Sequence, residues 1–153
     1  MDQRTFRDAM GKFATGITVV TTEVDGDIHG MTVNAFMSIS LDPMLVLVSI
    51  DEKASMYDKI VQADKFSISF LKEDQQSYSM IFANQLKPEK PIDFDRLNGQ
   101  PILKDTLAAI SCEKYELKQA GDHMLVIGKV TDIIINDGNP LLYFEGKYHN
   151  LKK

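Results

Sequence analysis

Short turns separate a series of strand-like runs along this chain. Residues 17–24 and 28–40 are rich in β-branched or alternating residues, and Asp25-Gly26-Asp27 lies between them. The turn Ala120-Gly121-Asp122 likewise leads into the long run 123–135. A short turn joins antiparallel neighbours, whereas parallel strands need a long crossover. The pattern therefore predicts a mainly β fold with antiparallel pairing.

The complete pattern predicts about seven strands and three helices. The remaining strands are expected at 45–50, 66–71, 107–117 and 141–148, and the helices after Asp2, at 53–63 and after Asp74. The first helix should carry Phe6, Met10 and Phe13 on one face and end at Gly16. Residues 84–101 contain two closely spaced prolines, so we expect them to form the one long loop.

Composition favours a single soluble domain over residues 1–153. Hydrophobic residues make up 44% of the chain and charged residues 25%, while the net charge of −5 argues against nucleic-acid binding. The one cysteine, Cys112, lies in a strand-like run and should be a small buried hydrophobe. No apolar run suggests a membrane span or a signal peptide, so we expect a cytoplasmic protein.

Uncharged polar residues recur at even spacing in the run 28–40: Thr32, Asn34, Ser38 and Ser40. Alternate residues of a straight strand point to the same side, so these side chains would share one face. A buried polar group without a partner costs about 1–3 kcal/mol. The row is therefore either solvated or faces a ligand whose polar rim and phosphate take up its hydrogen bonds.

The usual signatures of other chemistries are missing from the sequence. It contains no Rossmann glycine turn, no phosphate-binding loop and no nucleophile elbow. Its three histidines are far apart and lack local metal-ligand spacing, so no metal site is predicted. If the protein is an enzyme, a bound cofactor should supply the chemistry.

Several segments together resemble the flavin reductase-like family, the reductase partners of two-component flavin-dependent monooxygenases. The likeness is strongest to the reductase components of phenol and 4-hydroxyphenylacetate hydroxylases. The segments are, in chain order, 6–10 (FRDAM), 15–22 (TGITVVTT), 30–43 (GMTVNAFMSISLDP), 53–55 (KAS), 82–83 (FA), 121–123 (GDH) and 146–149 (GKYH).

The resemblance implies an antiparallel Greek-key split β-barrel with a few flanking helices. It also implies a homodimer with FAD or FMN bound near the subunit interface. Members of the family use NADH, or NADPH, to reduce the flavin by hydride transfer from nicotinamide C4 to flavin N5. They release the reduced flavin to a flavin-dependent monooxygenase. No catalytic side chain is expected, because the hydride passes directly between two aligned cofactors.

The resemblance also assigns cofactor-binding roles to individual residues. Thr32 to Ala35 would lie along the isoalloxazine, Lys53 and Ser55 would meet the phosphate, and His123 would border the nicotinamide. The full set is Met31, Thr32, Val33, Asn34, Ala35, Ser38, Ile39, Ser40, Lys53, Ser55, Phe82, Ala83, His123, Tyr148 and His149. Lys53 at a helix start would add its charge to free backbone N–H groups.

Two other functions stay open at this point. The chain could be a non-catalytic flavin-binding protein on the same barrel, or an interaction module without a cofactor. Individual residues also have plainer interpretations. Lys53 could be a solvated surface lysine, His123 could cap its turn, and Tyr148 and His149 could be packing residues.

Overall fold

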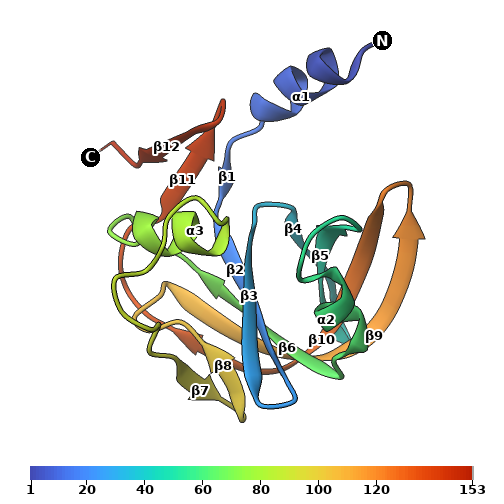
Figure 1. Ribbon diagram of the computed structural model, residues 1–153, viewed down its shortest axis with the longest axis vertical. Helices are drawn as coiled ribbons and strands as arrows, with labels where there is room; N and C mark the ends of the chain where they lie inside the picture. The colour runs from blue at the N-terminus through green and yellow to red at the C-terminus, as the bar shows by residue number, and fades with distance from the viewer. Residues whose placement is uncertain (153) are drawn as a thin grey trace.

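The computed structural model describes residues 1–152, which form a curved seven-stranded antiparallel sheet and two smaller sheets (Figure 1). The large sheet has the order β3-β2-β6-β9-β10-β5-β4. Its strands are β2 (Thr18–Val24), β3 (Asp27–Val33), β4 (Phe36–Leu41), β5 (Met44–Asp51), β6 (Lys65–Phe70), β9 (Ala108–Ala120) and β10 (His123–Ile135). The small sheets contain β1 (Thr15–Gly16), β11 (Leu141–Phe144) and β12 (Lys147–Asn150), and the hairpin β7 (Asp95–Leu97) and β8 (Gln100–Ile102).

Strands β3 and β4 are consecutive in sequence but form opposite edges of the large sheet. Only Asn34 and Ala35 link them, so the sheet must curl until its two ends approach each other. The link is fixed where the backbone N–H of Ser49 donates to the Ala35 carbonyl at 3.1 Å. The sheet does not close, and the expected antiparallel Greek-key split barrel is confirmed.

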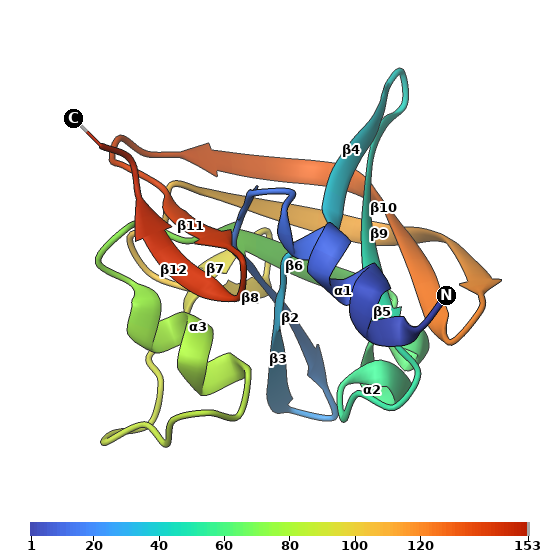
Figure 2. The ribbon, with the colours of Figure 1, turned by 90° about the horizontal axis from the view of Figure 1, so that it is seen from above.

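Three helices accompany the sheets: α1 (Gln3–Gly11), α2 (Tyr57–Gln62) and α3 (Gln76–Phe82). Asp2 caps α1, since its carboxylate accepts the Thr5 backbone N–H at 2.7 Å. Figure 2 shows α2 and α3 against the body of the fold, and Figure 1 shows α1 projecting away from it. α1 buries none of its residues, which leaves Phe6 and Met10 each 56% exposed.

The main core fills the curve of the large sheet. Val20, Val48, Ile68 and Val126 are fully buried there. Cys112 belongs to this core as predicted, and burial raises the pKa of its thiol to about 12. The thiolate is the reactive form of cysteine, so this residue is unsuited to nucleophilic chemistry.

A second hydrophobic cluster lies beneath α3 and the C-terminal hairpin β11–β12. Ile17, Leu71 and Leu141 are its buried centre, and Phe82 and Tyr148 pack against it. This cluster therefore connects the end of the chain with the helix that lines the pocket described below.

Several predicted elements need correction. The first helix ends at Gly11 instead of Gly16, with Lys12 as its C-cap. Asp74 does not cap α3, which begins after Gln75. The predicted loop 84–101 ends in the β7–β8 hairpin, whose turn residues Asn98 and Gly99 both have positive φ. The described residues contain twelve strands, because the predicted runs 28–40 and 141–148 are each split in two and β1, β7 and β8 were not predicted.

No helix within residues 1–152 is long and apolar enough to cross a membrane.

Candidate functional site

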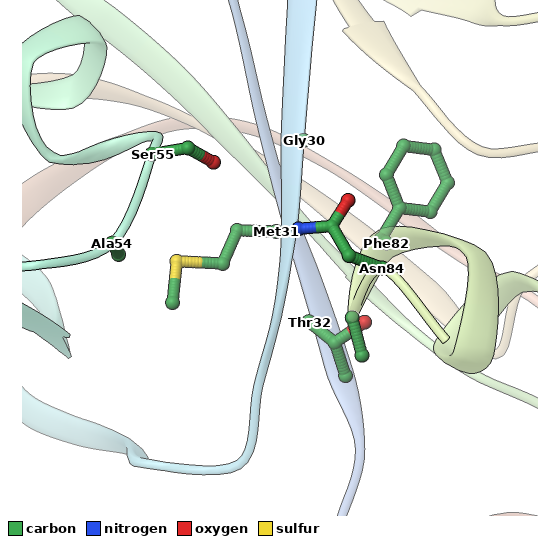
Figure 3. A pocket seen from close by; sticks show the side chains of 8 residues that line it. Gly30, Met31, Thr32, Ala54, Ser55, Phe82 and Asn84 are labelled. Carbon is green, nitrogen blue, oxygen red and sulfur yellow. The ribbon is translucent and has the colours of Figure 1, made fainter. Parts of the chain in front are cut away.

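A pocket of about 270 Å³ opens between β3, the end of α3 and the connection from β5 to α2. Its lining combines apolar and uncharged polar residues: Gly30, Met31, Thr32, Ala54, Ser55, Phe82, Ala83 and Asn84. In Figure 3 Met31 extends from β3 toward Ala54 and Ser55, while Phe82 and Asn84 come from the α3 side. Three segments that are distant in sequence thus meet at one cavity.

Gly30 lets α3 approach β3 closely. A Cβ atom at this position would lie 2.6 Å from two ring carbons of Phe82 and 3.3 Å from the Thr21 methyl group. Contacts that short do not occur between real side chains, so any larger residue would displace the Phe82 ring. A glycine inside a strand often marks such a close approach. The shape of this pocket wall therefore depends on Gly30 having no side chain.

Partly buried hydrogen bonds hold the α3 wall in place. The Thr32 hydroxyl donates to the Ser79 carbonyl at 2.6 Å. The Ser79 hydroxyl lies 2.8 Å from the Tyr148 hydroxyl, and Ser79 is only 1% exposed. The Thr32 hydroxyl therefore donates its one hydrogen bond within the protein and can only accept a hydrogen bond from a ligand.

The polar row does not lie on one straight strand. Asn34 falls in the link between β3 and β4, where its carbonyl accepts the Phe36 N–H. A bulge interrupts the pairing of β4 with β5 between Ser38 and Ser40, so the alternation shifts at Ile39. The expectation of a single shared face is wrong, because chain bend and bulge re-aim the side chains.

The opposite wall, from β5 to α2, is much more exposed. The Lys53 backbone N–H donates to the Asp51 carboxylate at 2.9 Å, while its side chain is exposed. The helix predicted for 53–63 begins only at Tyr57 and has no side-chain cap. Lys53 therefore does not stand in the first helical turn, and the predicted combination with helix N–H groups is wrong. Ser55 lines the pocket.

His123 begins β10, as expected, and pairs there with Asp51 of β5. Its Nδ1 lies 2.8 Å from the Asp122 carboxylate. The hydrogen bond from His123 holds the pKa of Asp122 below its usual range. Electrostatic attraction to His123, and to a smaller extent to Lys53, lowers this pKa further. His123 and Lys53 thus occupy one corner of the molecule, at the rim beside the β5–α2 connection.

The other candidate residues lie in several places. Met31, Thr32, Ser55, Phe82 and Ala83 line the common pocket. Val33 is 5% exposed in the main core. The rest lie on or before β4 (Asn34, Ala35, Ser38, Ile39, Ser40) or on β12 (Tyr148, His149).

Sequence reasoning missed four residues of this region as site residues: Gly30, Ala54, Asn84 and Ser79. Asn84 has a positive φ of 59° just after α3, a position that asparagine tolerates well. An asparagine at this place in the sequence can indicate the end of a helix, but it does not indicate that the residue lines a pocket. A buried helical serine such as Ser79 has no comparable signal.

Known proteins agree with this architecture along the whole chain. The model of the flavin reductase like domain family matches residues 10–152, and the chain belongs to this family. An NADH-dependent flavin reductase from Rhodococcus sp is 40% identical over 149 residues, covering 95% of this chain and 85% of the relative. The reductase component of 4-hydroxyphenylacetate 3-monooxygenase from Thermus thermophilus is 35% identical over 147 residues, covering 95% of each chain.

A solved structure shows the same likeness. Flavin reductase PheA2 in its native state is 57% identical and superimposes with a TM-score of 0.97, covering 100% of both chains. The resemblance predicted from the motifs is therefore confirmed.

Proposed function

We propose that this protein is an NADH-dependent flavin reductase that supplies reduced FMN or FAD to a separate flavin-dependent monooxygenase. One observation carries the proposal. Segments 30–43, 53–55 and 82–83, which carry the family likeness, each contribute residues to one pocket. Relatives named NADH-dependent flavin reductase and reductase component of a monooxygenase match nearly the whole chain and support the same role.

The pocket lining suits part of a flavin. Met31 and Phe82 offer apolar surface for a flat ring, and Ser55 and Asn84 offer hydrogen-bonding groups for its polar edge. Small-molecule sites usually measure 300–1,000 Å³. The observed 270 Å³ is enough for a portion of a dinucleotide-sized cofactor, so the remainder would lie outside the pocket, on the side of Ser55 and the neighbouring Lys53.

The chain's residues would act by binding and alignment. When bound, flavin accepts a hydride at N5 from nicotinamide C4, so no side-chain acid, base or nucleophile is required. Met31 to Ala35, Phe82 and Ala83 would position the ring, and Ser38 to Ser40, Lys53 and Ser55 would reach the ribityl and phosphate groups. His123 and His149 remain the predicted border of the nicotinamide site, whereas the Tyr148 hydroxyl is engaged with Ser79 instead. Holding two reactants in line is itself a large source of rate enhancement.

Steady-state oxidation of NADH by the purified protein tests the function. We expect the NADH absorbance to fall only when free FMN or FAD is added, with NADPH compared in parallel. A folded protein that binds flavin without oxidising either nucleotide would be a non-catalytic flavin-binding protein. A folded protein that binds no flavin would be an interaction module instead.

We also propose a homodimer, supported by exposed apolar side chains on two elements. Phe6 and Met10 of α1 lie uncovered, and Phe13 after the helix is 77% exposed. On the edge strand β4, Met37 is 53% exposed and the last residue, Leu41, is 86% exposed. A second copy that packs against both elements would remove these side chains from water.

Sedimentation tests the dimer. We expect twice the chain mass of 17.2 kDa at micromolar concentration. Phe6→Glu combined with Met10→Glu should yield monomers, whereas Thr5→Glu on the same helix should not. A parent protein that sediments as one chain would contradict the dimer. The cytoplasm stays the predicted location.

A further inference from the structure

Ser79 joins three elements around the pocket from a position that solvent does not reach. It lies on α3 and is 1% exposed. Its carbonyl accepts both the Thr32 hydroxyl at 2.6 Å and the Ala83 backbone N–H at 3.1 Å. A carbonyl oxygen has two lone pairs, so these two donors satisfy it. Thr32 and Ala83 themselves line the pocket, on β3 and just after α3.

The hydroxyl of Ser79 faces away toward β12. It lies 2.8 Å from the Tyr148 hydroxyl, and either oxygen can donate. The Tyr148 ring packs edge-on against Tyr143, with 5.4 Å between ring centroids. Both tyrosines pack against the second hydrophobic cluster, which also contacts Phe82. The C-terminal hairpin thus meets the back of the pocket wall through shared hydrophobic packing and one partly buried hydrogen bond.

Tyr148 is therefore held by the protein at its only polar atom. A tyrosine hydroxyl supplies one proton, and the nearest polar partner described is Ser79. If Tyr148 acted mainly by touching a cofactor, its hydroxyl would be expected to face the pocket, but it is not among the residues that line it.

We propose that Ser79 and Tyr148 are positioning residues for the flavin site. This inference rests on the proposed flavin reductase function. The Ser79–Tyr148 hydrogen bond fixes the rotation and depth of α3 against β3. Through the Ser79 carbonyl, it sets where Phe82, Ala83 and Asn84 stand relative to Met31 and Thr32. Tyr148 acts on the flavin through Ser79 and α3.

Two conservative variants remove this bond while keeping the packing. Tyr148→Phe retains the ring against Tyr143, and Ser79→Ala removes only the hydroxyl and leaves the carbonyl that accepts from Thr32. Each should raise the flavin dissociation constant by up to about fivefold, the largest change that loss of one partly buried hydrogen bond can pass to the site. The double variant should be no weaker than either single variant, because both delete the same interaction.

Tyr143→Phe is the matched control. It deletes a hydroxyl from the neighbouring ring, and within residues 1–152 that hydroxyl makes no hydrogen bond. Its flavin affinity should stay within about twofold of the parent. For all four variants we would measure flavin affinity by fluorescence titration, and kcat and the KM for NADH at saturating flavin. We expect kcat and the NADH KM to remain within about twofold of the parent.

Three results would overturn the positioning role. If Tyr148→Phe and Ser79→Ala bind flavin as tightly as the parent, the Ser79–Tyr148 hydrogen bond has only a structural role. A raised NADH KM with unchanged flavin affinity would place Tyr148 at the nicotinamide. Additive losses in the double variant would show that the two hydroxyls act separately. A parent protein that binds no flavin is a different failure, since it removes the proposed function itself.

Discussion

The two walls of the pocket are built in different ways. The α3 wall is packed and hydrogen-bonded, with Ser79 buried and Phe82 pressed against Gly30. The β5–α2 wall is an exposed connection, with Lys53 and Ser55 both open to solvent. In the described residues neither of these two side chains makes a hydrogen bond to the protein.

This contrast suggests a division of tasks. A close-packed wall has one arrangement, so it can fix the position of a flat ring. An exposed wall with a free cation can attract a charged group and let a product leave, but contributes little rigidity. We therefore expect substitutions on the α3 wall to affect flavin affinity most, and those at the exposed corner to affect it less.

Gly30→Ala should have the largest effect. The added methyl group would meet the Phe82 ring at 2.6 Å and push it from its place. Overpacking of this kind costs about 1–3 kcal/mol of folding stability. Flavin affinity should fall more than tenfold, measured by fluorescence titration at a temperature where the variant is folded. Gly16→Ala is the control, since nothing lies within 4 Å of its added methyl group. Unchanged affinity in Gly30→Ala would show that the Phe82 wall does not shape the site.

Lys53→Ala should have a smaller effect, confined to flavin binding. A charge-assisted contact with phosphate is lost, but the site is solvated, so we expect about a fivefold weaker affinity and little change in stability. Raising the salt concentration should weaken the parent more than the variant. Lys65→Ala, an exposed lysine at the start of β6, serves as control. If the parent and Lys53→Ala have equal flavin dissociation constants, Lys53 is a solvated surface lysine with no role in flavin binding.

His123→Ala should leave flavin affinity within about twofold, a difference of about 0.4 kcal/mol. The apparent KM for NADH should rise instead, because His123 lies at the rim and not in the pocket lining. The hydrogen bond with His123 lowers the pKa of Asp122. The stability from this pair is therefore complete at pH values above the ordinary carboxyl pKa, and it is lost as the pH falls through the lowered pKa and Asp122 takes up a proton. A parallel loss of both affinities, or a large loss of stability, would make His123 a structural cap.

Cys112→Ala should have the smallest effect on activity. The thiol is fully buried in the main core, away from the pocket. Flavin affinity and kcat should match the parent, and the folded parent should resist alkylation near pH 8. Burial raises the pKa of Cys112 from 9.0 to about 12, so the thiol of the folded protein keeps its proton where the unfolded chain ionises. The stability of the fold is therefore fully kept below pH 9 and falls as the pH rises toward 12. Rapid alkylation of the folded protein near pH 8 would contradict this assignment.

The sequence was most informative where turns bound a strand on both sides. The run 123–135 coincides with β10, because Gly121-Asp122 and the residues after 135 interrupt the pattern. The β7–β8 hairpin was missed, although Asn98-Gly99 is a strong hairpin signal. The preceding prolines, Pro88 and Pro91, favoured a continuous loop.

The site was less predictable than the fold. The family segments identified Met31, Thr32, Ser55, Phe82 and Ala83, which do line the pocket. Periodicity could not show that the strand bends at residues 34–35 or bulges near Ser38, because such irregularities depend on tertiary pairing. The role of Ser79 depends on three elements meeting, and no local pattern records that.

The most direct test of this account is a crystal structure of the protein with oxidised FAD or FMN bound. We predict that the isoalloxazine lies against Met31 and Thr32, with Phe82 and Ala83 beside it, and that the Ser79–Tyr148 hydrogen bond is kept. Flavin bound elsewhere would contradict the assignment of the site. A separate pocket lies between the end of α1 and the β11–β12 turn, lined by Arg7, Lys12 and Gly146 among others, and flavin bound there would be one such result.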